Sequence, residues 1–422
     1  MLPEEVILEN IGSWSAKLLR QQMCSNKKLS RLSVDPAEVE YALKFPSYAT
    51  LERLEHKWSI EHFKTQRFQM LKSAYCSPPR ANEDILSLAA DGFSSSQAVY
   101  QQELEHLKSW VKEVRLDELE FVKVMPLPVL FSAAATMFPS ELSEARVAWS
   151  KNSILVTAVD DLFDVVGSRE EMENFVALID KWEAHQEVGF CSEVVEILFR
   201  AVYDTSNEIG AKAAEVQNRS VINHISELWA HTARALMSEA EWRMSGNLPS
   251  SMEEYMVAGE PSIGLGPIVL PSLYLVGPEL PEDVVRGTEY GEMSRHMNIC
   301  GRLLNDLRTY AKESGEGTIN SVPLVADLRY GGRSGASSIE AAKRELSRTI
   351  EASRRELLRL VVRDGGAVPW PCRQLFWDMC KVLHLFYLEE DGYASPKEMM
   401  HAANAVILQP LQVPQPFGAA DE

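Results

Sequence analysis

Apolar residues recur at helical spacing along most of the chain after residue 82. The pattern predicts helices over 97–114, 144–166, 169–185, 192–209, 211–245 and 339–363. Loops are indicated by Gly189, by 247–251, by 276–278 and by 331–332, all rich in Gly, Pro, Asn or Ser. Alternating β-branched residues, which indicate strands, are nearly absent. The pattern therefore predicts an all-α fold.

In the first part of the chain the apolar pattern predicts shorter helices, over 4–20, 36–41 and 51–63. Residues 64–82 form a link in which Ser77-Pro78-Pro79 breaks any helix. We therefore expect two units, 1–75 and 76–422.

Residues 260–271 interrupt an otherwise helical pattern with three prolines and two glycines. Proline lacks the backbone N–H and clashes with the preceding turn, so a break in the helix is expected here. Because the segment is apolar, we expect it to face the interior and not the solvent.

Composition narrows the possible partners. The chain has 422 residues, 45% of them hydrophobic, and a formal net charge of −19. Such a charge disfavours nucleic acid and anionic membrane surfaces as partners, although bound metal ions could still bring an anionic substrate to a local site. The six cysteines form no C-x-x-C pair and no transmembrane-length apolar run is present, so we predict neither a structural zinc nor a membrane span.

Three acids end a long apolar segment, 154–166, which Gly167 is expected to stop. On a helix Asp160 and Asp164 are four residues apart and share one face, with Asp161 beside them. Ionised carboxylates in apolar surroundings are costly unless a cation meets them. A hard divalent cation such as Mg²⁺ is the natural partner, and a chance acidic cluster at a helix end is the alternative.

A second oxygen-bearing stripe lies far downstream. Asn305, Thr309 and Glu313 have the spacing i, i+4, i+8, which aligns an amide, a hydroxyl and a carboxylate on one helix face. Arg302 lies one turn earlier and Lys312 precedes Glu313. Cations beside metal ligands are explained if a multiply charged anion also binds, and a diphosphate bridged by Mg²⁺ fits. Lys312 is equally compatible with a solvated lysine.

Together the two motifs resemble the paired metal motifs of class I terpene synthases. Four other strings are similar to plant kaurene synthases and kaurene synthase-like enzymes: Phe131-Ser-Ala-Ala-Ala-Thr-Met-Phe-Pro139, Gly264-Leu-Gly-Pro-Ile-Val-Leu-Pro271, Cys300-Gly-Arg-Leu-Leu-Asn-Asp306 and His384-Leu-Phe-Tyr387. The resemblance extends over about residues 80–410.

This resemblance implies the all-α bundle of class I terpenoid synthases. Residues 1–75 would be a short remnant of the N-terminal helical domain, and 76–422 the metal-binding catalytic domain. The resemblance also implies three Mg²⁺ ions, for which Mn²⁺ could substitute, and a diphosphate held by Arg302. The implied metal ligands are Asp160, Asp161, Asp164, Asn305, Thr309 and Glu313.

The sequence departs from the family at the diphosphate site. Lys123 stands where kaurene synthases usually carry an arginine, about 37 residues before the acid motif. Lysine is a point charge and cannot make the bidentate contact that arginine makes with a phosphate. Leu162 replaces a phenylalanine of many relatives.

The resemblance also assigns a terpene pocket to the break at 260–271. Ile268 lies where relatives tune the product, and an isoleucine there implies a cascade that continues to a tetracyclic skeleton. Carbocations are stabilised by aromatic faces in a dry pocket. Aromatic candidates for the pocket, each of which also fits a plain core role, are Phe131, Phe163, Tyr274, Phe386 and Tyr387.

The function implied is that of a class I diterpene synthase of kaurene synthase-like type. It would ionise a bicyclic C20 diphosphate, ent-copalyl diphosphate, cyclise it to an olefin and release diphosphate. The sequence contains no Asp-x-Asp-Asp string, so an upstream class II diterpene cyclase would supply the substrate. The alternatives are a sesquiterpene synthase acting on farnesyl diphosphate and a decayed, non-catalytic relative. A chain-elongating prenyltransferase is disfavoured because it would need a second Asp-Asp-x-x-Asp.

Location follows only from the resemblance. Relatives of this kind work in plastids, which makes the plastid the first expectation. The acidic start Met-Leu-Pro-Glu-Glu has the pattern of neither a transit peptide nor a secretory signal, so the cytoplasm is the alternative.

Overall fold

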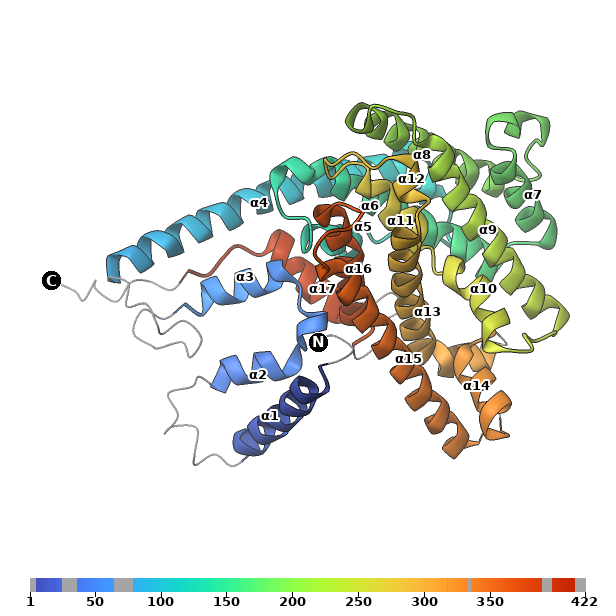
Figure 1. Cartoon of the computed structure of the whole chain (residues 1–422). Coiled ribbons are helices and arrows are strands. Elements are labelled where there is room, and N and C mark those ends of the chain that lie inside the picture. The colour runs from blue at the N-terminus through green and yellow to red at the C-terminus, as the bar shows by residue number, and fades with distance from the viewer. Residues whose placement is uncertain are drawn as a thin grey trace.

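The computed structural model describes residues 5–24, 36–63, 79–316, 318–332, 335–388 and 397–413. Regular structure within these ranges is helical, as the sequence predicts (Figure 1). The α-helices are α1 Val6–Cys24, α2 Pro36–Lys44, α3 Glu52–Glu61, α4 Pro79–Glu113, α5 Pro126–Ala134, α6 Ser143–Asp161, α7 Arg169–Asp180, α8 Glu193–Gln217, α9 Ile222–Ser245, α10 Met252–Ser262, α11 Leu265–Leu273, α12 Glu282–Val285, α13 Thr288–Glu316, α14 Ser321–Tyr330, α15 Ala336–Val362, α16 Trp370–Phe386 and α17 Lys397–Ala403.

Short non-α turns connect several of these helices. Within the described ranges, four of them are 3₁₀ turns, namely Ser47–Ala49, Leu116–Glu118, Ser140–Leu142 and Trp182–Glu187, and two are π-helical, namely Leu162–Val166 and Asn404–Leu408. The first π turn directly continues α6, so it extends the helix that carries the acid motif.

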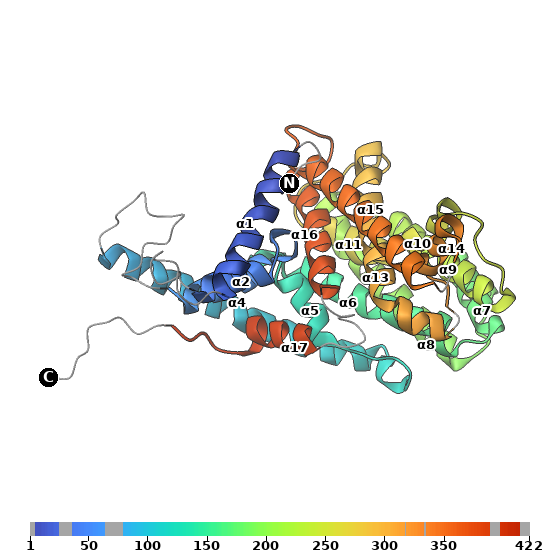
Figure 2. The same ribbon diagram turned by 90° about the horizontal axis from the view of Figure 1, so that it is seen from below.

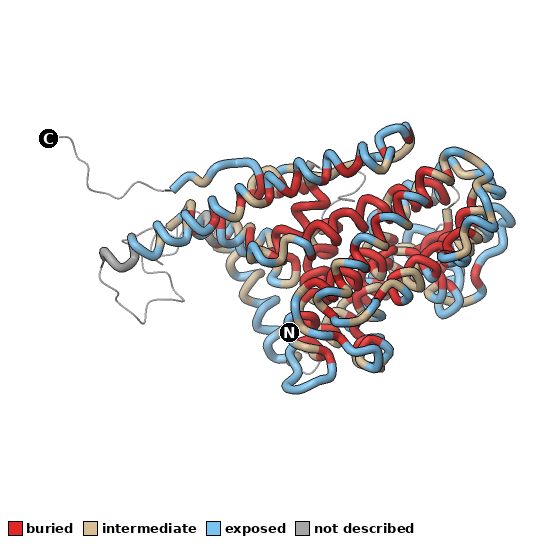
Figure 3. The backbone as a smooth tube through the Cα atoms, turned by 90° about the horizontal axis from the view of Figure 1, so that it is seen from above, coloured by how far each residue is buried: buried red, intermediate tan, exposed pale blue. Residues whose placement is uncertain are grey.

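A main apolar core lies inside the bundle, where the buried residues gather (Figure 3). Helix α6 is buried along most of its length and packs against α5, α8 and α11, while α13 packs against α14, α15 and α16. The largest fully buried side chains include Trp149 on α6 and Trp229 on α9. Helix α9 joins α7, α10 and α11, so it links the α6 side of the bundle to the α10–α13 side.

Two helix boundaries differ most from the predicted ones. Helix α4 begins at Pro79 and is far longer than 97–114, because proline is tolerated in a first helical turn. The predicted break near Gly210 is wrong. A Cβ at Gly210 would lie 3.3 Å from Ile222 Cδ1, so this glycine permits close helix packing, and the chain turns instead at Asn218, which has a positive φ of 51°.

The predicted break within 260–271 is present. Helix α10 ends at Ser262, and α11 starts after Gly264, whose φ is 72°. A Cβ at Gly264 would approach Val156 Cγ1 to 2.3 Å, so both conformation and space require glycine. The break therefore sits directly against α6.

The N-terminal helices are joined to the bundle unequally. Leu51, just before α3, belongs to the main core, and Lys57 of α3 donates hydrogen bonds to the carbonyls of Gln409 and Pro410. Helix α1 runs along one side of the molecule with an exposed apolar face (Figure 2). Most of the predicted link, 64–78, lies outside the described residues. No helix among the described residues is long and apolar enough to cross a membrane.

Candidate functional site

The acid motif lies where α6 changes into a π turn. Asp160 and Asp161 close the α-helix, and Asp164 belongs to the π turn. The backbone N–H of Gly167 donates to the carbonyl of Leu162 over 2.8 Å, a bond that spans five residues. A Cβ at Gly167 would lie 2.3 Å from this oxygen, so glycine makes the wider turn possible. The sequence predicted regular α-helix up to Val166, and this turn corrects it; such π bulges are frequent at functional sites.

The surroundings of Asp160 and Asp161 disfavour the ionised forms of both carboxyls. Burial raises the pKa of Asp160 well above its usual range, with further contributions from the charges of Asp164 and Glu239. Burial also raises the pKa of Asp161, while a hydrogen bond from the backbone of Lys123 and the charges of Lys123 and Lys312 lower it. Asp161 Oδ2 is buried and has no hydrogen-bond partner among the described residues. A bound cation would stabilise the ionised forms of these carboxylates.

The second motif lies on α13, and the charges of two basic residues of this helix act on the carboxyls of the acid motif. The positive charge of Arg302 lowers the pKa of Asp160, and that of Lys312 lowers the pKa of Asp161. Lys312 and Lys123 are both exposed, Lys123 in the irregular segment before α5. Helix α13 thus brings Asn305, Thr309 and Glu313 to one face, and its residues Arg302 and Lys312 lie close enough to the end of α6 for their charges to act on the acid motif.

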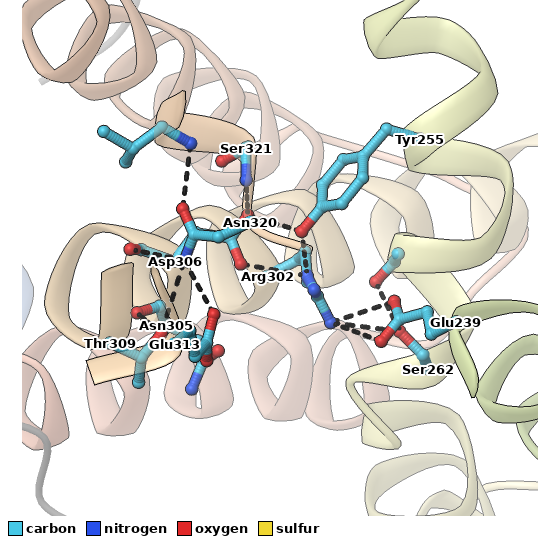
Figure 4. Close-up of polar contacts among 12 residues, drawn as sticks. Glu239, Tyr255, Ser262, Arg302, Asn305, Asp306, Thr309, Glu313, Asn320 and Ser321 are labelled. Atoms are coloured by element: carbon cyan, nitrogen blue, oxygen red, sulfur yellow. Dashed lines mark hydrogen bonds and ion pairs between the residues drawn. The ribbon is translucent and has the colours of Figure 1, made fainter. Parts of the chain in front are cut away.

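Arg302 is held in a buried network on α13 (Figure 4). Its Nη1 lies 3.0 Å from Glu239 Oε1, its Nε donates to the Tyr255 hydroxyl over 2.7 Å, and the same Nε lies 3.1 Å from Asp306 Oδ1. Asp306 is fully buried and accepts a hydrogen bond of 2.8 Å from Tyr255. Asp306 therefore holds Arg302 and Tyr255 in position, and it does not share the helix face of Asn305, Thr309 and Glu313.

Glu239 of α9 is a site residue that the sequence did not suggest. Ser262 Oγ donates to Glu239 Oε1 over 2.7 Å, so this carboxylate joins α9 and α10 to Arg302 on α13. Burial raises the pKa of Glu239, and the charge of Asp164 raises it further. The sequence around Glu239 carries no signal for this role; in the structure Glu239 lies one helical turn before Arg243, which contacts the acid motif.

Asn320, at the N-cap of α14, ties the second motif together. Its Nδ2 donates to Glu313 Oε2 and to the backbone carbonyl of Asp306, each over 2.9 Å, and lies 3.5 Å from Thr309 Oγ1 (Figure 4). Its Oδ1 accepts from the Val322 N–H, which caps the helix. Burial, followed by the charge of Asp306, raises the pKa of Glu313 to about 7.

Asp164 is engaged by an arginine of α9. Arg243 Nη1 donates to Asp164 Oδ1 over 2.8 Å, and its Nη2 donates to the carbonyl of Phe163. No group of three or more His, Cys, Asp or Glu side chains within the described ranges converges on one point as a metal site. The donors present, which are carboxylates, one amide and one hydroxyl, are nonetheless those that a hard divalent cation prefers, and the unpaired Asp161 oxygen fits one.

The pocket candidates are all buried but are not all near this site. Tyr387 accepts a hydrogen bond of 3.1 Å from Asn305, and the ring of Phe163 packs edge-on against Phe175 of α7. Tyr274 instead lies 2.6 Å from His224 Nδ1 at the start of α9, about 28 Å along the helix from Arg243. Ile268 is 5% exposed, four residues after the Gly264 break, while Phe131 and Phe386 belong to the main core.

Comparison with known families gives one domain match. Residues 112–356 match the family described as "Terpene synthase family, metal binding domain". This stretch contains both motifs and Arg302.

Two curated relatives are similar over nearly the whole chain. Dolabradiene synthase, chloroplastic, of Zea mays is 61% identical over 97% of this chain and 47% of the relative. Ent-kaur-16-ene synthase, chloroplastic, of Oryza sativa subsp. japonica is 52% identical over 98% of this chain and 54% of the relative. The chain thus spans about half the length of the curated relatives it matches.

Solved structures share the fold. Abietadiene synthase from Abies grandis superposes with a TM-score of 0.85 at 27% identity, over 97% of this chain and 54% of that one. Isoprene synthase from Populus x canescens, described in complex with three Mg²⁺ ions and dimethylallyl-S-thiolodiphosphate, gives 0.81 at 22% identity, over 97% of this chain and 74% of that one.

Proposed function

The chain belongs to the terpene synthase family, and we propose that it is a class I diterpene synthase of kaurene synthase-like type. Its substrate would be a bicyclic C20 diphosphate, ent-copalyl diphosphate, which it would cyclise to a diterpene olefin with release of diphosphate. The observation that carries the proposal is the presence of two oxygen-rich walls, the end of α6 with its π turn and the middle of α13, around Asp160 and Asp161, whose ionised forms are disfavoured by burial.

In this proposal each wall has a defined task. Asp160, Asp161 and Asp164 would hold divalent ions on one side, and Asn305, Thr309 and Glu313 on the other. Three Mg²⁺ ions, or Mn²⁺ in their place, would supply the positive charge that lets the diphosphate leave. Isoprene synthase, which shares this fold, is described with three Mg²⁺ ions and a diphosphate analogue.

Protein cations would complete the diphosphate site. Arg302 is already oriented by Glu239 and Tyr255, so little side-chain freedom would be lost when it meets a phosphate. Lys123 and Lys312 are exposed and their charges reach Asp161, which would place them on the solvent side of the same anion. The buried Ile268, Phe163 and Tyr387 would form the apolar wall that excludes water from the cation.

We further propose the domain division and the setting. Residues 1–75 would belong to an N-terminal helical domain, of which helix α3 is docked on the catalytic unit 76–422. Several similar relatives are described as chloroplastic, which favours the plastid for this chain. A class II diterpene cyclase would then supply the bicyclic diphosphate.

The test is incubation of the protein with Mg²⁺ and a panel of C10, C15 and C20 diphosphates, linear and bicyclic, with gas chromatography and mass detection of the extract. We expect an olefin only from the bicyclic C20 diphosphate, and none when a chelator is present. Products from farnesyl diphosphate alone would replace the diterpene proposal with a sesquiterpene synthase. No product from any substrate would identify a decayed relative.

A further inference from the structure

Arg243 forms hydrogen bonds with two consecutive residues of the π turn, Phe163 and Asp164. One guanidinium nitrogen donates to the Asp164 carboxylate over 2.8 Å, and the other donates to the carbonyl of Phe163. The Arg243 side chain is 23% exposed and that of Asp164 is 40% exposed, so the pair is partly open to water. The fork shape of arginine makes such a two-point contact possible, whereas lysine cannot form it.

We propose that Arg243 is an internal counter-ion for Asp164 that must be displaced when a divalent metal binds, so that this residue sets the metal concentration at which the site fills. The proposal rests on the proposed function, because it takes Asp164 to be a metal ligand. It adds a positioning residue that acts through Asp164.

Displacement is required because arginine cannot be neutralised. The guanidinium stays protonated at every pH that a folded protein tolerates, so it cannot give up its charge to make room for a metal. Asp164 Oδ1 is the atom that Arg243 occupies, and a metal ion bound to the same oxygen would bring a second positive charge to within a few ångströms of the first. The two cations therefore compete for one carboxylate.

Two charged residues of helix α9 contact the two walls of the site. Glu239 and Arg243 are one turn apart and share a face of α9. Glu239 pairs with the basic Arg302 of α13, and Arg243 pairs with the acidic Asp164 after α6. Helix α9 thus places an acidic residue against Arg302 and a basic residue against Asp164. These two ion pairs hold both walls in place while the metal is absent.

A matched control exists on the same helix. Arg234 of α9 lies 2.7 Å from Asp180 Oδ1 at the end of α7, so it is an exposed arginine–aspartate pair of the same kind, outside the acid motif. A plain structural pair, as at Arg234, contributes to stability whether or not a metal is present. A competing counter-ion changes the metal dependence itself.

The experiment is thermal unfolding of the whole chain during titration with MgCl₂ at a fixed concentration of inorganic diphosphate. The variants are Arg243→Gln, Arg243→Lys, Arg234→Gln and Asp164→Asn. Partly exposed ion pairs of this kind correspond to about a two- to fivefold change in an equilibrium constant. We therefore expect Arg243→Gln to unfold at a lower temperature in chelator but to reach half-saturation at about two- to fivefold less Mg²⁺ than the wild type.

The other variants separate the explanations. Arg243→Lys keeps the charge without the fork and should lie between Arg243→Gln and the wild type, which keeps the test open if Arg243→Gln does not fold. Arg234→Gln should lose stability without a change in the Mg²⁺ midpoint. The double variant with Asp164→Asn should erase the effect of Arg243→Gln.

Two outcomes would overturn the proposal, and they differ from failure of the proposed function. An Arg243→Gln midpoint equal to or above that of a wild type that does respond to Mg²⁺ removes Arg243 from competition while leaving the metal site intact. A wild type whose unfolding does not respond to Mg²⁺ with diphosphate overturns both the metal site and the role of Arg243.

Discussion

Asn320 Nδ2 donates a hydrogen bond of 2.9 Å to Glu313 Oε2, and this bond joins the start of α14 to the last carboxylate of the second motif. The same amide also holds the Asp306 carbonyl and, through its oxygen, caps α14. Asn320 itself is 1% exposed, so its amide depends on these partners and not on water. One side chain therefore fixes both the helix start and the direction of Glu313.

We expect Asn320→Ala to lower the free energy of unfolding by about 1–3 kcal/mol, since a cap is lost and buried polar groups stay unpaired. Because Glu313 also loses its support, the Mg²⁺ concentration for half-maximal activity should rise. Chemical denaturation and a metal titration measure the two effects. Ser192→Ala, which removes the cap of α8 through the Val195 N–H, should destabilise without altering the metal response. An Asn320→Ala enzyme with normal metal dependence would restrict Asn320 to a capping role.

Removal of either outer carboxylate of the acid motif should abolish turnover without unfolding the protein. We expect Asp160→Ala and Asp164→Ala to lose at least about a hundredfold in kcat, since stabilisation of leaving-group charge is of that order or larger. Asp160→Ala should not reduce stability in chelator, because burial disfavours the ionised Asp160. Activity assays and thermal unfolding in chelator are the measurements. Near-normal turnover in either variant would show that the metal assignment is wrong.

Periodic features were predictable from the sequence, and cross-helix partners were not. The apolar period predicted the helices, and the spacing of Asn305, Thr309 and Glu313 predicted a shared face. The π turn escaped prediction because it depends on how closely Gly167 approaches the Leu162 carbonyl.

The missed site residues share one property. Glu239 and Arg243 act on residues about 60 and 80 positions away, at Arg302 and Asp164, and nothing in their local sequence encodes those partners. Asn320 is polar and close to the second motif, but only the turn into α14 brings its amide back to Glu313. Spacing rules describe one helix at a time, whereas a site between helices is set by packing.

Lys123 lies in the irregular segment before α5, where its backbone bonds to Asp161 and its charge reaches the same carboxylate. We expect Lys123→Arg to lower KM or raise kcat by about two- to tenfold, because a guanidinium fork can bind phosphate bidentately. Steady-state kinetics with the bicyclic C20 diphosphate tests this. Lys123→Met is the matched control and should be slower than the wild type. An unchanged or poorer Lys123→Arg enzyme would mean that the position does not reach the diphosphate.

The pKa of Glu313, about 7 without metal, predicts a pH dependence of metal binding. Below pH 7 the carboxyl is protonated and a metal must displace the proton, so the Mg²⁺ midpoint should rise by up to about tenfold per pH unit. Above pH 7 the contribution of Glu313 to the midpoint should be level. Metal-dependent thermal unfolding between pH 5.5 and about 8.5 measures this.

In chelator, pH acts on stability in the opposite direction. Low pH weakens metal binding, but it favours the folded state through Glu313. The folded-state pKa of Glu313 lies above its usual value of 4.5, so the folded state holds the proton more tightly. Stability from this group is present at low pH and is lost as pH rises from about 4.5 to 7. Glu313→Gln should remove this slope, and its difference from the wild type isolates Glu313 from other titrating groups. A wild-type midpoint that is independent of pH would contradict the assignment of Glu313 as a ligand.

The last prediction concerns Ile268, which lies in α11 four residues after the break at Gly264 and is almost fully buried. Isoleucine offers only dispersion to a passing carbocation, whereas threonine has a similar shape and carries a dipole. In a low-dielectric pocket this dipole could change a barrier by about 1–3 kcal/mol, which is about ten- to a hundredfold in partitioning. We therefore expect Ile268→Thr to divert product from a tetracyclic to a tricyclic, pimarane-like olefin with little loss of total turnover. Ile268→Val, which changes volume but adds no dipole, is the control and should keep the wild-type product ratio by gas chromatography with mass detection. An identical product spectrum for Ile268→Thr would exclude Ile268 from contact with the rings, because a hydroxyl dipole beside a migrating charge cannot leave every branch of the cascade unchanged.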